Sequence, residues 1–235
     1  LTFQKHTMMN IVTIDTEIIK CIPPKTESES EQYQYCDGWT DYTGMGIACI
    51  CLYRLSDTAK FYWADLAYKP DETQSLSPVQ YISNDTSFDL TIASTNHKIW
   101  GFNSIGFDDK LLSANRIKYR TEYDLLTEVR HSAFGSTRWQ DQPYGRTYKL
   151  DAIANANLGR GKIGHGEKAP KQWQDGKYID VLNYCMDDCV LLARLTELFL
   201  SGKLKDPNTG KIILPREDIE VFDTYDKFFI KSADR

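Results

Sequence analysis

One stretch near the start of the chain constrains the fold more than any other: Asn10-Ile11-Val12-Thr13-Ile14-Asp15-Thr16-Glu17-Ile18-Ile19. Its β-branched residues form a near-continuous apolar run, which predicts a buried strand. Side chains alternate across a strand, so Asp15 and Glu17 project from the same face. Two carboxylates there are costly to bury unless a cation meets them. A divalent metal is one interpretation, because hard oxygen ligands suit Mg²⁺ or Mn²⁺. A solvated strand end, or a salt bridge to a distant Lys or Arg, are the alternatives.

The composition indicates an ordinary globular protein. The 235 residues are enough for one large α/β domain with a full core. A net charge of -5 and a pI near 5.4 give no global basic character, although a local basic groove can occur on an acidic protein. No apolar stretch reaches transmembrane length and no signal peptide is visible, so no membrane partner is expected. The six cysteines lack zinc-type spacing, and we expect reduced thiols in a cytoplasmic protein.

The pattern along the chain changes from strands alone to alternating helices and strands. Apolar runs predict strands at 10–19, 46–55 and 60–68, as in an antiparallel meander, with shorter strands at 98–102 and 122–123. Helices are expected at 78–84, 87–95, 108–115, 125–134, 150–158 and 177–200. This order of elements implies one mixed sheet flanked by helices.

Two further acidic sites accompany the first strand. In Gly101–Asp108 an apolar strand ends, a turn of small residues follows, and Asp108 stands where a helix is expected to begin. Capping of that helix is the alternative role for Asp108. In the long helix, Tyr184 and Asp188 are four residues apart and share one face, whereas Asp187 points about 100° away. A solvated acidic face is the alternative there, and it suits Asp187 better than Asp188.

Taken together, these residues resemble the DEDD (DnaQ-like) superfamily of 3′–5′ exonucleases, in the branch with a tyrosine in its third motif. Asp15-Thr16-Glu17 matches Asp-x-Glu, Asn103 through Asp108 matches Asn-x-x-x-Phe-Asp, and Tyr184 through Asp188 matches Tyr-x-x-x-Asp. The resemblance implies an RNase H-like α/β fold with a five-stranded mixed sheet flanked by helices, similar to polymerase proofreading domains. No polymerase motifs are visible, so a free-standing enzyme is expected.

The resemblance also suggests a domain organisation. Residues 10–203 would form the RNase H-like exonuclease domain, with 25–43 as an inserted polar loop that we expect to be mobile over 25–37. Residues 1–9 have no core pattern and are expected to be disordered or foreign to the natural protein. Residues 204–235 would be a C-terminal extension.

The implied chemistry explains the need for several carboxylates. Two metal ions about 3.5–4 Å apart can hold both the attacking water and the leaving oxygen of a phosphodiester. The resemblance implies that Asp15 bridges two Mg²⁺ or Mn²⁺ ions, and that Glu17 and Asp188 hold the ion carrying the water. Asp108 would act on the second ion through water. Tyr184 would orient the attacking water or deprotonate it, and orientation is favoured because an unperturbed tyrosine has a pKa near about 10.

The expected substrate contacts have a weaker basis. Thr16, Asn103 and Phe107 are assigned to the terminal nucleotides by their place in the matched motifs, although Phe107 fits the core equally well. Lys162 and His165 lie in a glycine-rich basic loop, residues 159–166, which also carries Arg160. Such a loop suits close approach to phosphates, but it also suits a flexible surface connection.

The sequence therefore predicts a metal-dependent 3′–5′ exonuclease that releases nucleoside 5′-monophosphates from single-stranded 3′ ends, with DNA favoured over RNA. The alternatives are an exoribonuclease of the same superfamily, a catalytically silent nucleic-acid-binding module on the same fold, and an endonuclease. No sequence feature reads the 2′-hydroxyl.

Overall fold

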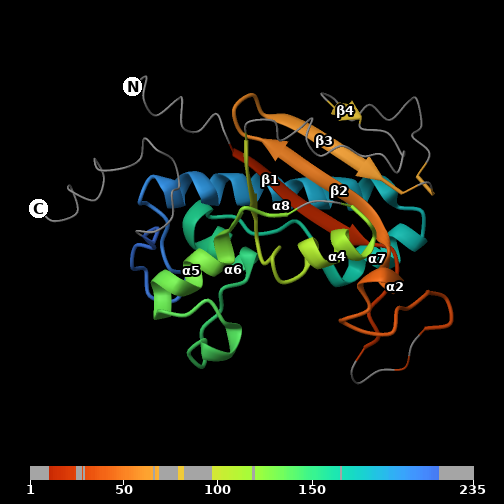
Figure 1. Ribbon diagram of the computed structural model, residues 1–235, viewed down its shortest axis with the longest axis horizontal. Coiled ribbons are helices and arrows are strands. Elements are labelled where there is room, and N and C mark those ends of the chain that lie inside the picture. Colours follow the sequence, from red (N-terminus) through yellow and green to blue (C-terminus); the bar gives the residue numbers. More distant parts are fainter. Residues whose placement is uncertain are drawn as a thin grey trace, which may run out of the picture.

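The computed structural model describes residues 11–24, 28, 30–65, 67–68, 79–81, 97–117, 120–164 and 166–216. Its centre is a mixed sheet with helices on both faces (Figure 1). The strands are β1 (Ile11–Ile18), β2 (Ile47–Arg54), β3 (Ala59–Ala64), β4 (Val79–Tyr81), β5 (Lys98–Gly101) and β6 (Tyr123–Asp124). The helices are α2 (Tyr42–Met45), α4 (Asp108–Ala114), α5 (Leu125–Phe134), α6 (Leu150–Leu158), α7 (Ala169–Gln174) and α8 (Tyr178–Leu200), with short 3₁₀ turns η1 (Trp139–Asp141) and η2 (Gly166–Lys168).

The strand order is β4-β3-β2-β1-β5-β6. β1, β2 and β3 form the predicted antiparallel meander, while β5 pairs parallel with β1, and β6 pairs parallel with β5. The α/β class and the mixed sheet flanked by helices are thus confirmed. The five expected strands are all present, and β4, which pairs parallel with the outer edge of β3, adds a sixth.

The predicted helix at 78–84 is wrong in its described part, because Val79–Tyr81 is a strand. A short run without periodicity does not distinguish a helix from a strand, and here the free edge of β3 supplies hydrogen-bond partners that favour the strand. The helix expected at 87–95 lies outside the described residues, as do residues 1–9.

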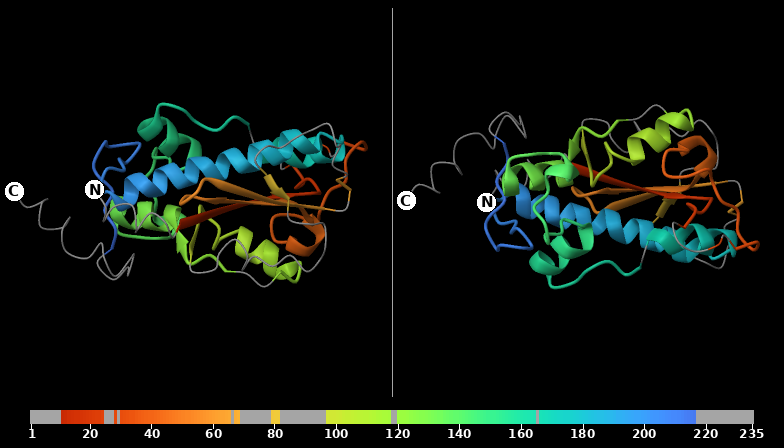
Figure 2. Two further views of the ribbon diagram at one scale, coloured as in Figure 1. Left: turned by 90° about the horizontal axis from the view of Figure 1, so that it is seen from above. Right: turned by 90° about the horizontal axis from the view of Figure 1, so that it is seen from below.

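The two faces of β1 pack against different helices. Figure 2 shows α8, with α6 and α7, on one side of the sheet and α4 on the other. Val12 and Ile14 face the α4 side, where they share a core with Leu111 and Leu112. Thr13 faces α8, since its hydroxyl donates to the carbonyl of Cys189 at 2.7 Å. Alternation along the strand therefore directs Asp15 and Glu17 toward α8 as well.

α8 is the main support of the sheet. Its 23 residues run along β1 and β2, and its apolar face is buried as the helical spacing predicted. Phe199, near its end, packs edge-on against the buried Trp100 of β5, with ring centroids 6.0 Å apart. This packing fixes α8 along its length, and so fixes the position of Asp188 against β1.

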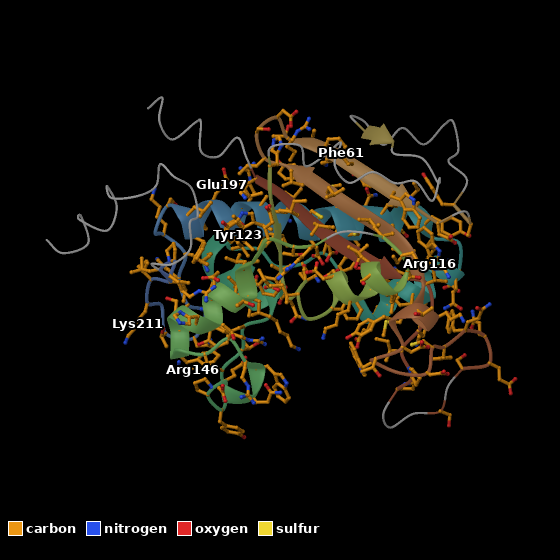
Figure 3. All side chains as sticks on the ribbon, viewed as in Figure 1. Phe61, Arg116, Tyr123, Arg146, Glu197 and Lys211 are labelled. Atoms are coloured by element: carbon orange, nitrogen blue, oxygen red, sulfur yellow. The ribbon has the colours of Figure 1, made fainter. Side chains whose placement is uncertain are left out.

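The two segments expected to be peripheral are anchored in their described parts. Gln34 donates its backbone N–H to the side chain of Gln174 in α7 at 2.7 Å, and Gln174 also donates to the carbonyl of Ile19. The described part of the 25–37 loop thus contacts α7, and its expected mobility stays a prediction. In the C-terminal extension, Leu204 and Ile213 are buried in the core. Figure 3 shows Lys211 and Arg146 at the periphery of the molecule, away from the sheet.

Candidate functional site

Three carboxylates from two elements meet between the sheet and α8. Asp15 and Glu17 come from β1, and Asp188 comes from the middle of α8. One oxygen from each of the three lies within 4.8 Å of the other two. The sequence placed Asp15 and Glu17 on one face, and the packing of α8 on that face brings Asp188 to them.

The cluster is short of positive charge. Glu17 is 7% exposed and Asp188 is 3% exposed. Oδ2 of Asp15 and Oδ1 of Asp188 are buried and have no hydrogen-bond partner among the described residues. Burial, followed by the charges of Asp188 and Asp108, raises the pKa of Asp15 well above its usual range. Buried acceptors of this kind, all of them hard oxygens, fit Mg²⁺ or Mn²⁺.

Asp108 lies beside this cluster but outside the group of three. It occupies the first turn of α4, is buried, and accepts a hydrogen bond from the Thr16 hydroxyl. It does not cap its helix, since the residue at the cap position is Phe107 and no side chain caps there. Burial raises the pKa of Asp108 to about 6, partly offset by hydrogen bonds from Thr16 and Ser104. The Thr16 hydroxyl thus supports Asp108 of the second motif, and its predicted contact with the terminal nucleotide stays a prediction.

Tyr184 lies one helical turn before Asp188, and its side chain is buried. Its hydroxyl has no hydrogen-bond partner among the described residues. Burial, and then the neighbouring charge of Asp188, raises its pKa. Tyr184 therefore keeps its proton near neutral pH, which favours orientation of a water over its deprotonation.

Lys162 supplies the one cation that the structure places against the three carboxylates in its described part. Its ammonium forms an ion pair with Oδ2 of Asp188 and lies 4.9 Å from the ring centroid of Tyr184. Burial lowers the pKa of Lys162, but the charges of Asp15 and Asp188 outweigh that effect and raise it. The sequence assigned Lys162 to substrate phosphates, and this contact with the carboxylates was not foreseen.

The basic loop that carries Lys162 is held in place rather than free. Asp151 of α6 accepts the backbone N–H of Lys162 at 2.9 Å. Arg160 pairs with Asp187 at 3.1 Å, so Asp187 is engaged in an ion pair and is not simply solvated. A side chain at Gly161 would collide with Asp151, whose Oδ1 would lie 2.0 Å from the added Cβ. His165 lies outside the described residues.

The turn before α4 presents Asn103 to solvent, with φ at 64°. Asparagine tolerates this left-handed conformation better than most residues. Phe107 is half-buried and meets the ring of Tyr42 edge-on at 5.9 Å, so it belongs in part to the core. Asn103 is the more accessible of the two predicted substrate contacts.

Asp124 was missed by the sequence reasoning. It is 3% exposed and accepts four backbone N–H groups: from Asn103 and Ile105 in the turn, and from Leu126 and Thr127 at the start of α5. It therefore ties the turn that precedes Asp108 to a neighbouring helix. The only signal in the sequence was an Asp directly before an apolar helix, which predicts a cap.

A second group of possible ligands consists of the sulfurs of Cys49, Cys51 and Cys185, which also lie within 4.8 Å of one another. The Cys51 thiol donates to the carbonyl of Leu182, and the Cys185 thiol donates to the carbonyl of Asp15. These contacts account for the thiol protons of Cys51 and Cys185. Burial raises the pKa of the Cys49 thiol, but hydrogen bonds from Cys185 and Cys51 outweigh that effect and lower its pKa to about 5. All six cysteines of the chain are buried and free.

No protein-family model matches this sequence, and no curated protein matches it. Among the described residues, none of the helices combines the length and apolarity needed to cross a bilayer.

Protons and Mg²⁺ should compete for the carboxylates. A group whose pKa is raised in the folded state stabilises the fold below its unfolded pKa, and this stability is lost as pH rises through the folded pKa, about 6 for Asp108. Without metal, the free energy of unfolding should therefore fall through this range. Mg²⁺ should restore it, so the Mg²⁺-induced rise in Tm should grow between about pH 5 and about pH 8. Thermal unfolding in EDTA and in Mg²⁺ measures this, and a Mg²⁺ effect that is absent or independent of pH would contradict it.

Asp124→Ala should destabilise the protein by roughly 2–4 kcal/mol, because it leaves several backbone N–H groups without a hydrogen-bond acceptor and removes a helix cap. Urea denaturation measures the loss. Asp141→Ala is the control, since Asp141 is exposed and its ion pair with Arg138 spans 4.0 Å. Equal stability of the two variants would show that Asp124 does not support the turn.

Proposed function

We propose that this protein is a metal-dependent 3′–5′ exonuclease that hydrolyses phosphodiester bonds at the 3′ end of single-stranded DNA. The observation that carries the proposal is the convergence of Asp15 and Glu17 from the first motif with Asp188 from the third. One oxygen from each of these three carboxylates lies within 4.8 Å of the other two. Asp108 and Tyr184, the other two matched residues, lie beside the same group.

The architecture supports the RNase H-like fold that the motifs suggest. An antiparallel meander with parallel strands added on the far side of β1 places the first motif in the central part of the sheet. The second motif follows β5, the neighbour of β1, and the third lies on the helix that crosses both. Each motif is thus on the type of element that the resemblance requires.

Two divalent ions, when bound, would stabilise the charge that develops on the phosphoryl group and on the leaving oxygen, and would lower the pKa of a water. Asp15 would be shared between them, as the resemblance implies, and the charges of both Asp188 and Asp108 are close enough to raise its pKa after burial. Glu17 and Asp188 would hold one ion. Asp108, kept in orientation by the Thr16 hydroxyl, would act on the other.

Tyr184 would orient the attacking water. Its buried hydroxyl retains its proton and has no hydrogen-bond partner among the described residues, so it is available to donate a hydrogen bond. Gly164 leaves room for its ring, because a Cβ at that position would come within 2.8 Å of Cδ2 of Tyr184. The exposed Asn103 would contact the terminal nucleotide.

Asp15→Asn and Asp188→Asn should each lower kcat by at least about 10³-fold, because each removes a charged ligand of the reacting centre. Asp187→Asn is the matched control. This variant makes the same change, Asp to Asn, at the residue next to Asp188. Because Asp187 pairs with Arg160 and not with the carboxylate group, activity should stay within about threefold of the parent. The assay follows a 5′-labelled single-stranded DNA in Mg²⁺, Mn²⁺ and EDTA. Undiminished shortening by Asp188→Asn would exclude the proposed role.

The same assay identifies the substrate. Shortening one nucleotide at a time from the 3′ end is expected for linear single-stranded DNA, together with mononucleotide products. A matched RNA oligomer should be cut more slowly, and faster cutting would identify an exoribonuclease. Circular single-stranded DNA should stay intact, and its cleavage would identify an endonuclease.

Tyr184→Phe should slow turnover by about 10- to 100-fold, since it removes one hydrogen-bond donor from the water. Mn²⁺ affinity should be unchanged, because the carboxylates remain. Calorimetry with Mn²⁺ and single-turnover kinetics measure the two effects separately. Full activity in this variant, or a parallel loss of Mn²⁺ binding, would contradict the assigned role.

A further inference from the structure

A pocket of about 260 Å³ lies directly beside the carboxylate group. It is lined by Lys162, Ile163, Gly164, Lys168 and Gln172, from the loop after α6, from η2 and from α7. Lys162 is common to the pocket and to the carboxylate group, because its ammonium pairs with Asp188. The two sites are therefore adjacent and share one cation.

The lining of this pocket suits an anion. Its lining includes two lysines and one glutamine, and none of the described residues that line it is acidic. Lys168 is exposed and forms no ion pair with any described residue, so its charge is available to a ligand. A phosphate group carries several acceptor oxygens and a negative charge, and lysine is a common point-charge partner for it.

The wall of the pocket is fixed by contacts already described. The backbone N–H of Lys162 is held by Asp151, and Gly164 lies against the ring of Tyr184, where no side chain would fit. A ligand in this pocket is thus held close to Tyr184 and Asp188.

We infer that this pocket is a phosphate subsite for the nucleic-acid strand, and that Lys162 passes from Asp188 to the bound phosphate when divalent ions neutralise the carboxylates. This inference rests on the proposed function for its substrate class. A divalent cation that binds Asp188 competes with the Lys162 ammonium for that carboxylate, and its binding frees Lys162 for the pocket that it already lines. Binding of the nucleic acid and binding of the metal ions are then coupled through the side chain of Lys162. A released nucleoside monophosphate offers the same phosphate chemistry, and the experiment separates the two sources.

The subsite is tested in EDTA, where no metal contributes. Lys168→Gln and Lys171→Gln remove the same charge from positions three residues apart. Lys171 does not line the pocket, and it lies 5.5 Å from the ring of Tyr33. Lys168→Gln should weaken binding of a labelled oligo-dT about fivefold or more and reduce the log–log salt slope by about 0.7, the value for one phosphate contact on a single strand. Lys171→Gln should change affinity by less than about twofold. Equal effects of the two variants would overturn the subsite.

A second arm uses thymidine monophosphate in place of the oligonucleotide, measured by calorimetry. If Lys168→Gln binds the mononucleotide as the parent protein does but binds the oligonucleotide more weakly, the subsite holds a phosphate within the nucleic-acid strand. If Lys168→Gln binds both the oligonucleotide and the mononucleotide more weakly, the subsite holds the terminal or released phosphate.

The shared role of Lys162 is tested by Mn²⁺ binding without nucleic acid. Lys162→Gln should raise Mn²⁺ affinity by about tenfold or more, because a competing cation is removed from Asp188. Arg160→Gln is the control from the same loop, and it should leave Mn²⁺ affinity within about twofold, since Arg160 pairs with Asp187. Unchanged or weaker Mn²⁺ binding by Lys162→Gln would overturn the exchange.

The outcomes separate this inference from the proposed function. If the parent protein binds no Mn²⁺ and cuts no nucleic acid, the proposed nuclease fails, yet the comparison of Lys168→Gln with Lys171→Gln in EDTA still decides the subsite. If the protein is an active nuclease and those two variants bind the oligonucleotide alike, the subsite alone fails.

Discussion

The mutual repulsion of buried carboxylates is the constraint on which the rest of this structure depends. Asp15, Glu17 and Asp188 are brought together where water is largely excluded, and their pKa values are raised by that burial. Such an arrangement is unfavourable unless positive charge compensates for it. Within the described structure the compensation comes from the ammonium of Lys162. Divalent ions would provide more charge, and the oxygen ligands present are those that Mg²⁺ and Mn²⁺ favour.

The surrounding elements hold these groups against their repulsion. α8 is packed along β1 and β2, which prevents Asp188 from moving away from the strand. Asp124 accepts hydrogen bonds from four backbone N–H groups and so fixes the turn before Asp108. Asp151 holds the loop that carries Lys162. Buried, well-connected supports of this kind keep a reactive site in one geometry.

Much of the fold and of the candidate site could be predicted. The strand around Asp15 was recognised by its β-branched run, and α8 by its apolar spacing; both lie where they were expected. A local pattern was misleading at 79–81, where strand pairing decided the outcome. Val79–Tyr81 is a strand because the edge of β3 lies beside it. The described part of 25–37 is anchored because the side chain of Gln174 accepts a hydrogen bond from the backbone of Gln34 and donates one to it. Neither partner is close in sequence, so no local pattern could reveal it.

By itself, the sequence determined that Asp15 and Glu17 share a face and that Tyr184 and Asp188 share another. It also contains three acidic motifs in an order that resembles that of the DEDD exonucleases. Strand alternation and helical periodicity are local rules, and they hold wherever the elements form. Only the tertiary structure decided that the two faces meet, that Thr16 holds Asp108, and that Lys162 pairs with Asp188. Those contacts join residues far apart in the chain, and they depend on the register of β1 and on how α8 packs against it.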